Sequence, residues 1–436
     1  MAGLIKPIKK EIAPLDLLQW NRFDVMFKYL YGLSRKKGWD TDFFESMYHH
    51  HIKIWNGYSE YDDESKNSFT LFRSRFDNLL DEIEEKGFDS ARSLVAVADN
   101  KYLLNGAHRL SACLLGSRDI SYFDARDVQD GQLDCSYYFF RQLKQYGALD
   151  KSLADRAALE YAKLKPKSRI VTLYPSATRF GRIDEVLAIL KKHCQIVYEK
   201  SVKLNQLGAV NLMRELYYKE PWAEQKGGAG CAHKAGLCFQ VKGLFKRIAP
   251  MRVFLVEFED LNASVRAKEE IRTLYNIEKH SVHINDTYEE TLRLVKCLFN
   301  KNSIHFLNHF NGHFCPLFEE LLQELTEWIN SHGLDSDDYC VSAGSVLTAY
   351  GLKECKDIDY LHSDSKEYLE NELIQSHNSY GVGRYHTVTD DIVHNPENHF
   401  YRYGIKYASL NVVRQLKERR GEPKDKKDLK LIKGLR

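Results

Sequence analysis

Two aspartates near the C-terminus, Asp357 and Asp359, have the spacing of a cation site. In an extended strand, residues two apart point to the same side, so these carboxylates would lie together while Ile358 turns inward. Paired carboxylates suit Mg²⁺, which also takes oxygens from the phosphates of a bound substrate. The pattern predicts metal-dependent phosphate chemistry, with Asp357 and Asp359 as the metal-binding and catalytic pair.

A Gly-Ser pair, Gly344 and Ser345, ends an apolar strand-like run a short distance before these aspartates. Glycine lets the backbone approach a phosphate closely, and serine adds a hydroxyl at the start of a helix. A Gly-Ser pair followed by Asp-x-Asp resembles the minimal nucleotidyltransferase fold family. The resemblance implies that Gly344 and Ser345 hold nucleotide phosphates, and that Asp357 and Asp359 hold the metal.

The nucleotidyltransferase family usually has a third carboxylate on a later strand. Asp391 is the candidate for this metal ligand, and the flanking residues leave its neighbour Asp390 open as the alternative. The basic segment 417–428 resembles the closing helix of small family members. Because such domains also persist as binding or scaffolding modules, the resemblance speaks for the fold more directly than for catalysis.

A second phosphate-binding pattern lies nearer the N-terminus. The run Asn105-Gly106-Ala107-His108-Arg109 follows an apolar stretch and opens a helical pattern. Free amides at a helix start favour an anion, the glycine permits a tight turn, and arginine forks onto phosphate. The alternative is a capped helix whose histidine and arginine contact only local backbone.

This run resembles the ParB and sulfiredoxin superfamily, in which a Gly-x-His-Arg or Gly-x-x-Arg loop binds nucleotide phosphates. The resemblance implies that Gly106, His108 and Arg109 grip phosphate, with Asn105 beside them, and we also assign His108 to catalysis. Sulfiredoxins have cysteine between the glycine and the histidine, where this chain has Ala107. That difference argues against sulfinic acid reduction.

The middle of the chain contains a further candidate phosphate-binding site. His283 precedes a predicted helix, and Lys268 lies on the helix before it. These two residues are expected to bind a phosphorylated donor. The segment 226–236, which precedes both residues in the sequence, is rich in glycine and predicts a loop.

The elements that must position these residues follow from apolar periodicity. Residues 1–65 and Ser65–Lys86 have helical spacing, whereas 90–116 predict strand, turn at Asp99-Asn100, strand, loop and helix. Residues 150–300 alternate helix and strand, which is typical of an α/β domain. The strands predicted there are Ile170–Tyr174, Gln195–Glu199 and Met251–Phe258. The helices predicted there are Arg182–His193, Leu204–Lys219, Asn262–Tyr275 and Thr287–Phe299.

Length and pattern together predict several domains, because 436 residues exceed one ordinary core. We expect a helical lead-in and a ParB/sulfiredoxin-like domain over 1–148. An α/β middle domain is expected over 149–332, and a nucleotidyltransferase-like domain over 333–436. The predicted fold class is thus α/β and α+β in a multidomain chain.

Composition limits the setting in which the chain acts. Hydrophobic residues make up 43% and charged residues 28%, which is a globular balance. The formal net charge of +2 and the lack of a basic helix-turn-helix argue against a nucleic-acid partner. No apolar run is long enough to span a bilayer, and the N-terminus lacks a signal-peptide pattern. The cysteines form no paired motif, so we expect reduced thiols and a cytoplasmic protein.

Two phosphate-handling patterns in one chain predict an Mg²⁺-dependent transferase that uses a nucleotide or another phosphorylated donor. The layout resembles bacterial surface-polysaccharide biosynthesis proteins, which implies a sugar or sugar phosphate acceptor in capsule or O-antigen assembly. One alternative is a glycosyl or phosphoribosyl transferase whose activity depends on His283 and Lys268. Another is a non-catalytic scaffold that binds nucleotides.

Overall fold

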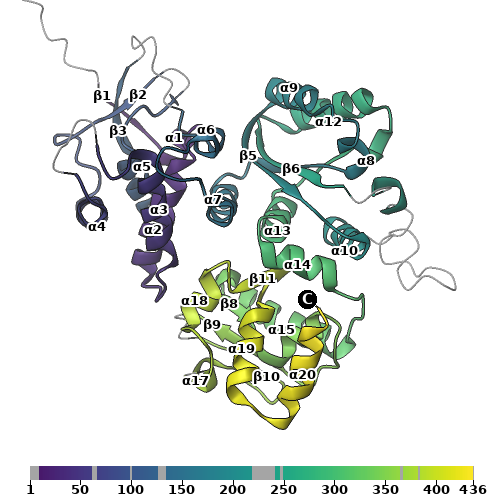
Figure 1. Cartoon of the computed structure of the whole chain (residues 1–436). Coiled ribbons are helices and arrows are strands. Elements are labelled where there is room, and N and C mark those ends of the chain that lie inside the picture. Colours follow the sequence, from purple (N-terminus) through teal and green to yellow (C-terminus); the bar gives the residue numbers. More distant parts are fainter. Residues whose placement is uncertain are drawn as a thin grey trace, which may run out of the picture. The chain divides into compact units, whose positions relative to one another are not determined.

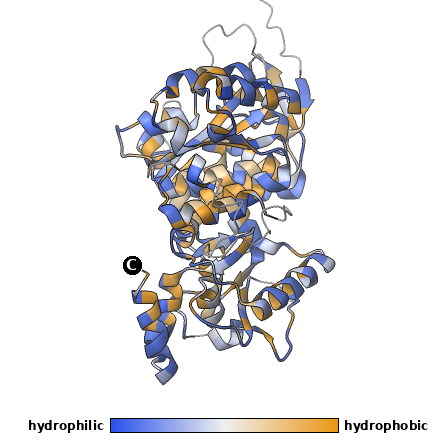
Figure 2. Ribbon diagram, turned by 90° about the vertical axis from the view of Figure 1, so that its right-hand side faces the viewer, coloured by the Kyte–Doolittle hydropathy of each residue, from blue (hydrophilic) through white to orange (hydrophobic). Residues whose placement is uncertain are grey.

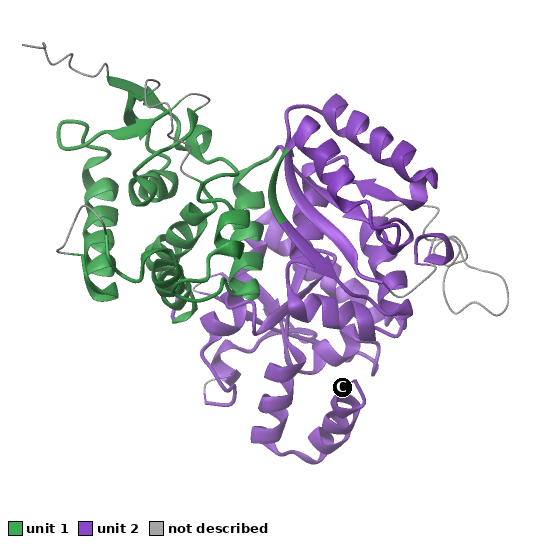
Figure 3. Cartoon of the chain, turned by 45° about the horizontal axis from the view of Figure 1, so that its top comes forward, with its two compact units in different colours: residues 1–38, 42–166, 195–198 green, residues 39–41, 167–194, 199–436 purple. Residues whose placement is uncertain are grey.

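A computed structural model describes residues 9–60, 66–98, 101–125, 134–218, 241–245, 249–363, 367–381 and 383–435. The chain divides into two compact units (Figures 1 and 3). Unit 1 comprises 1–38, 42–166 and 195–198, and unit 2 comprises 39–41, 167–194 and 199–436. The first unit therefore extends past the expected boundary at 148. The expected boundary at 332 does not separate compact units, since both flanking regions belong to unit 2.

Unit 1 combines a small sheet with a group of helices. The sheet has the order β1-β3-β2, with β1 and β3 antiparallel and β2 and β3 parallel. Its strands are β1 (Lys9–Ile12), β2 (Val95–Val97) and β3 (Ile120–Asp124). Its helices are α1 (Pro14–Leu17), α2 (Asp24–Lys37), α3 (Phe43–Asn56), α4 (Phe69–Lys86), α5 (Ala107–Gly116), α6 (Tyr137–Gln142) and α7 (Lys151–Leu164).

Helix α2 is the centre of unit 1. It is buried on nearly all sides and packs against α3, α5 and α7, while α4 packs against α5. Its contact with α5 includes a hydrogen bond in which Ser111 Oγ donates to the Val25 carbonyl at 3.2 Å. The second strand expected at 102–104 is reduced to a single bridge between Val97 and Leu103. The expected turn at Asp99-Asn100 lies outside the described residues.

The first part of unit 2 alternates helices and strands as predicted. Its sheet has the order β5-β6-β4-β7, and β4 pairs antiparallel with both β6 and β7. β6 lies between β4 and β5 in the sheet, which gives a split βαβ arrangement with helices between the successive strands. Antiparallel pairs therefore replace the parallel sheet that is common in α/β domains. The strands are β4 (Ser168–Leu173), β5 (Cys194–Val202), β6 (Met251–Phe258) and β7 (Val282–Ile284). The helices are α8 (Pro175–Thr178), α9 (Ile183–His193), α10 (Gln206–Leu216), α12 (Leu261–Tyr275), α13 (Tyr288–Leu298) and α14 (Lys301–His309).

The second part of unit 2 has a five-stranded mixed sheet of order β10-β9-β8-β12-β11. Strand β9 runs antiparallel to β8 and parallel to β10, and β12 runs parallel to β8 and antiparallel to β11. The strands are β8 (Tyr339–Val341), β9 (Ile358–His362), β10 (Ile374–Ser376), β11 (His399–Arg402) and β12 (Ile405–Ala408). The helices are α15 (Pro316–Ser331), α16 (Ala343–Ala349), α17 (Asn378–Gly381), α18 (Thr389–His394), α19 (Leu410–Arg420) and α20 (Pro423–Lys433).

The basic C-terminal segment is a pair of helices rather than one closing helix. Helix α19 ends at Gly421, whose φ of 68° is left-handed, and α20 begins at Pro423. Their apolar sides join the core around α16 and β9. None of the described helices is both long and apolar enough to cross a membrane, and Figure 2 shows polar and apolar residues mixed along them. The glycine-rich segment 226–236 lies outside the described residues.

Candidate functional site

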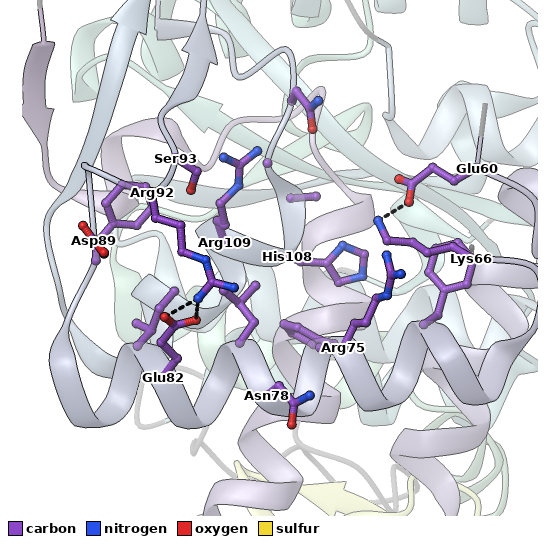
Figure 4. Close-up of a pocket in the computed structure, with 18 of the residues that line it drawn as sticks. Glu60, Lys66, Arg75, Asn78, Glu82, Asp89, Arg92, Ser93, His108 and Arg109 are labelled. Carbon is purple, nitrogen blue, oxygen red and sulfur yellow. Dashed lines mark hydrogen bonds and ion pairs between the residues drawn. The ribbon is translucent and has the colours of Figure 1, made fainter. Parts of the chain in front are cut away.

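A cavity of about 500 Å³ in unit 1 contains the N-terminal motif (Figure 4). The run Asn105–Arg109 forms one side of this cavity, and α4 with the segment that follows it forms another. Phe72, Phe76 and Phe88 add apolar surface to the wall. Concave sites of roughly 300–1,000 Å³ with apolar walls and a few polar groups are typical of small-molecule binding.

Gly106 brings the backbone at the start of α5 to the cavity. Its φ of 107° lies in the region that favours glycine, and a Cβ there would lie 2.7 Å from Val95 Cγ1. The same Cβ would lie 3.3 Å from the Nε and Nη2 atoms of Arg109. Glycine is therefore required both by the turn and by the close approach of the guanidinium to the loop.

Arg109 is directed by one backbone contact. Its Nη1 donates to the Leu94 carbonyl at 2.9 Å, and in the described part of the chain this is its one hydrogen bond. Burial lowers the pKa of Arg109, yet a guanidinium stays charged in proteins. The remaining N–H groups of the fork are thus available to an anion at the cavity wall.

Cationic side chains outnumber carboxylates on the described wall of the cavity. The cations are Lys66, Arg75, Arg92 and Arg109. The carboxylates are Glu60, Glu82 and Asp89. Lys66 forms an ion pair with Glu60, and Arg92 Nη1 lies 2.6 Å from Glu82 Oε2. The local excess of positive charge favours an anionic ligand.

His108 faces the same cavity in a neutral state. Its Nε2 lies 2.8 Å from the Tyr48 hydroxyl, and its ring packs at 4.8 Å against Phe76. Burial and the nearby Lys28 and Lys66 ammonium groups hold the pKa of His108 well below its usual value. Figure 4 shows Arg75 reaching from α4 toward this imidazole.

A buried ionic cluster supports the motif from behind. Arg22 Nε donates to Asp24 Oδ1 and Arg22 Nη2 to Asp24 Oδ2, both at 2.9 Å, and Lys28 Nζ lies 3.1 Å from Asp24 Oδ2. Arg22 Nη1 also donates to the Leu103 carbonyl at 2.9 Å, just before the motif. Burial alone would raise the pKa of Asp24, but Arg22 and Lys28 outweigh it and hold that pKa far below its usual range.

The carboxylate pair predicted near the C-terminus lies on unit 2. Asp357 is exposed immediately before β9, and Asp359 lies within β9. Asp359 Oδ1 lies 2.9 Å from His377 Nε2, and the Asp359 side chain is 14% exposed. His377 follows β10, in which Gln375 is in register with Asp359. Sequence spacing does not reveal this histidine, because the parallel pairing of β9 and β10 brings it there.

The Gly-Ser pair lies beside these aspartates, as the motif predicts. Ser345 Oγ accepts from the Asp359 amide at 3.0 Å and donates to the Asp357 carbonyl at 3.4 Å. A Cβ on Gly344 would lie 3.1 Å from Lys353 Nζ, so a lysine ammonium adjoins this turn. The Ser345 hydroxyl thus joins α16 to β9, and binding phosphate would require it to leave these partners.

Asp391 does not join the carboxylate pair, which corrects its expected role as a metal ligand. Its Oδ2 accepts from Thr387 Oγ1 at 2.9 Å and Asn398 Nδ2 at 2.8 Å, and its Oδ1 accepts from Asn395 Nδ2 at 3.0 Å. These bonds join Asp391 to residues on both sides of α18. Across the described residues, no three His, Cys, Asp or Glu side chains are grouped to hold a metal ion.

The alternative Asp390 does not supply the missing ligand either. Its Oδ1 accepts from Ser363 Oγ at 2.5 Å, beyond the far end of β9. An ion at this site would therefore have Asp357 and Asp359 as its protein carboxylates, with its other oxygens from substrate or water.

His283 and Lys268, the candidate phosphate-binding residues in the middle of the chain, lie close to each other. Burial and the Lys268 ammonium lower the pKa of His283 to about 4. His283 Nε2 is buried with no hydrogen-bond partner among the described residues. Lys268 Nζ forms an ion pair with Asp286 Oδ1 at 3.2 Å, so its charge is already partly matched.

Comparison with known proteins gives little information about this chain. No family model matches the chain, and no curated protein is similar to it. Among solved structures, the orthorhombic crystal form of the Aquifex aeolicus nucleoside diphosphate kinase aligns with 29% of this chain and 89% of its own, at 15% sequence identity. The TM-score of 0.21 is too low for this similarity to indicate the fold or the activity of the chain.

Proposed function

We propose that the chain is a transferase that binds a nucleotide or another phosphorylated donor in the cavity of unit 1. The observation that supports this most is the convergence of the Gly106 loop with Arg109, Arg75 and Lys66 around one cavity. Phosphate oxygens are acceptors only, and this wall offers donors and positive charge. The aromatic wall from Phe72 to Phe88 suits the base or sugar of such a ligand.

The proposal includes Mg²⁺ at the Asp357 and Asp359 pair of unit 2. Asp357 is exposed directly before β9 and Asp359 lies within it, so the pair fits an ion that takes most of its oxygens from phosphate and water. When bound, Mg²⁺ would offset the negative charge of a phosphate held at this site of unit 2, which is a separate site from the cavity of unit 1. Here Asp357 and Asp359 would hold the ion, and Gly344 would lie beside the phosphate. Lys353 adjoins Gly344, with its ammonium paired to Asp428 at 3.3 Å.

For the acceptor we propose a sugar or sugar phosphate in surface-polysaccharide biosynthesis. This part of the proposal rests on the resemblance of the domain layout alone. The competing glycosyl or phosphoribosyl transferase would place the donor at His283 and Lys268, where the Lys268–Asp286 ion pair already uses part of the positive charge. The cavity of unit 1, with Arg109 and Arg75 on its wall, favours donor binding in unit 1.

A thermal-shift screen tests the proposal on the full chain. ATP, CTP, GTP, UTP and phosphoribosyl pyrophosphate are each added with and without Mg²⁺. A ligand at ~100 times its dissociation constant adds about 2.7 kcal/mol to the free energy of unfolding, which is a readily measured shift. We expect one phosphorylated compound to stabilise the chain, and Asp357→Asn to remove the Mg²⁺-dependent part of that shift.

Asp184→Asn is the matched control, because Asp184 is an exposed carboxylate on α9 of unit 2, outside the five-stranded sheet that contains β9. It should keep the full Mg²⁺ effect. If no phosphorylated compound stabilises the chain, the donor-binding proposal fails. If a compound stabilises it equally with and without Mg²⁺, the metal part alone fails.

A further inference from the structure

We propose that Tyr48 fixes the tautomer of His108, so that His108 presents an Nδ1–H donor to a phosphate in the cavity instead of a proton-accepting nitrogen. The binding of a phosphate in the cavity rests on the proposed function. The tautomer is a property of the chain without ligand, and it can be measured separately. The proposal replaces the catalytic role expected for His108 by a binding role.

The direction of the Tyr48–His108 hydrogen bond follows from burial. Tyr48 is 0% exposed, and among the described residues His108 Nε2, at 2.8 Å, is the one partner of its hydroxyl. If Nε2 carried the hydrogen, the phenol oxygen would accept it and the phenol hydrogen would have no acceptor. Buried polar groups are rarely left unpaired, so the phenol donates and Nε2 accepts.

A charged imidazolium is excluded by the surroundings of the ring. Two further buried residues, Lys28 and Arg22, add positive charge near His108, and Asp24 offsets only part of it. Lys66 on the cavity wall acts in the same direction, and burial disfavours any charge on the ring. The pKa of His108 is therefore well below its usual value, and the neutral ring carries one hydrogen. With Nε2 accepting from Tyr48, that hydrogen is on Nδ1.

Nδ1–H adds a further hydrogen-bond donor to the cavity wall. No described residue forms a hydrogen bond to Nδ1, and His108 lies on the cavity wall between Arg109 and Arg75 (Figure 4). The guanidinium groups of Arg109 and Arg75 and the Nδ1–H of His108 are then all donors on this wall. An oxyanion such as phosphate matches this set, whereas a hydroxyl waiting to be deprotonated does not.

The tautomer is tested by nitrogen NMR of the full chain labelled with ¹⁵N-histidine. The His108 signals are identified by their loss in His108→Asn. We expect a protonated Nδ1 and an unprotonated Nε2 in the unmodified chain, and a shift toward the Nε2–H form in Tyr48→Phe. The control is Tyr58→Phe, which breaks the exposed Tyr58–His49 pair of 2.7 Å and should leave His108 unchanged. A proton on Nε2 in the unmodified chain, or no response to Tyr48→Phe, overturns the proposal.

Binding of inorganic pyrophosphate, measured by calorimetry, tests the role. His108→Asn keeps an amide donor near the Nδ1 position and should change the affinity by less than about 3-fold, whereas His108→Asp should weaken it by about 10-fold or more. Equal losses in the two variants would contradict a donor role. If neither pyrophosphate nor any nucleotide binds the unmodified chain, the proposed function fails, while the NMR result still decides the tautomer.

Discussion

Replacing Arg109 by methionine is expected to weaken binding of the phosphorylated ligand by about 10-fold to 100-fold, because a hydrogen bond to a charged group contributes roughly 1.5–3 kcal/mol. Arg109 sits against Gly106, where its fork faces the cavity. The affinity of Arg109→Lys should lie between those of the unmodified chain and Arg109→Met, because lysine keeps the charge and loses the planar guanidinium. Isothermal titration calorimetry with the compound found by the thermal screen measures the change.

Arg118→Met is the control for this prediction. Arg118 is exposed just beyond the other end of α5 and does not line the cavity. It should bind the ligand like the unmodified chain. Because Arg109 also bonds the Leu94 carbonyl, circular dichroism must show that the variant is folded. A folded Arg109→Met chain with unchanged affinity would remove the cavity from the proposed function.

The Asp24→Asn substitution is expected to lower the free energy of unfolding of unit 1 by about 3–5 kcal/mol, because it leaves two buried cations without their counter-charge. The Asp24 carboxylate accepts from Nε and Nη2 of Arg22 and from Lys28 Nζ, and its side chain is 6% exposed. Chemical denaturation monitored by tryptophan fluorescence measures the decrease in the free energy of unfolding. Because Arg22 also holds the Leu103 carbonyl, ligand affinity should fall as well.

The acid response of the chain gives a second measure of Asp24. The pKa of Asp24 is held below its unfolded value, so its contribution to stability is complete above about pH 4 and is lost as the pH falls below that value. Asp24→Asn should lack this part of the acid response. In contrast, Asp81→Asn breaks the exposed Arg35–Asp81 pair and should cost at most about 1 kcal/mol. Equal costs for Asp24→Asn and Asp81→Asn would contradict the account.

Elements with strong periodicity were predictable from the sequence, and short paired strands were not. The helices and strands that were predicted within 150–300 match elements of the structure because each carries its own apolar pattern, whereas α7, α8 and β7 in the same region were not predicted. Strand β1 was predicted as helix, and β3 was not predicted. Both are short, and β1 exists through pairing of Lys10 with Tyr122, a partner far along the chain.

The same distinction explains which site residues the sequence revealed. Residues 105–109 form one continuous motif, and they line the cavity together as expected. Lys66, Arg75 and Arg92 come from α4 and its flanks, and only the packing of α4 on α5 brings them to the motif. Asp391 was wrong as a metal ligand because its acidity was visible in the sequence, whereas its hydrogen bonds to Thr387, Asn395 and Asn398 were not.

Hydrogen–deuterium exchange of the full chain, with and without the stabilising phosphorylated compound, tests most directly where the ligand binds. The account predicts slower exchange in segments 66–93 and 103–110, which line the cavity of unit 1. Protection of 339–362 should appear in addition only when Mg²⁺ is present. Protection confined to 339–362, or to 268–291, with no change in 103–110, would contradict the assignment of the donor site to unit 1.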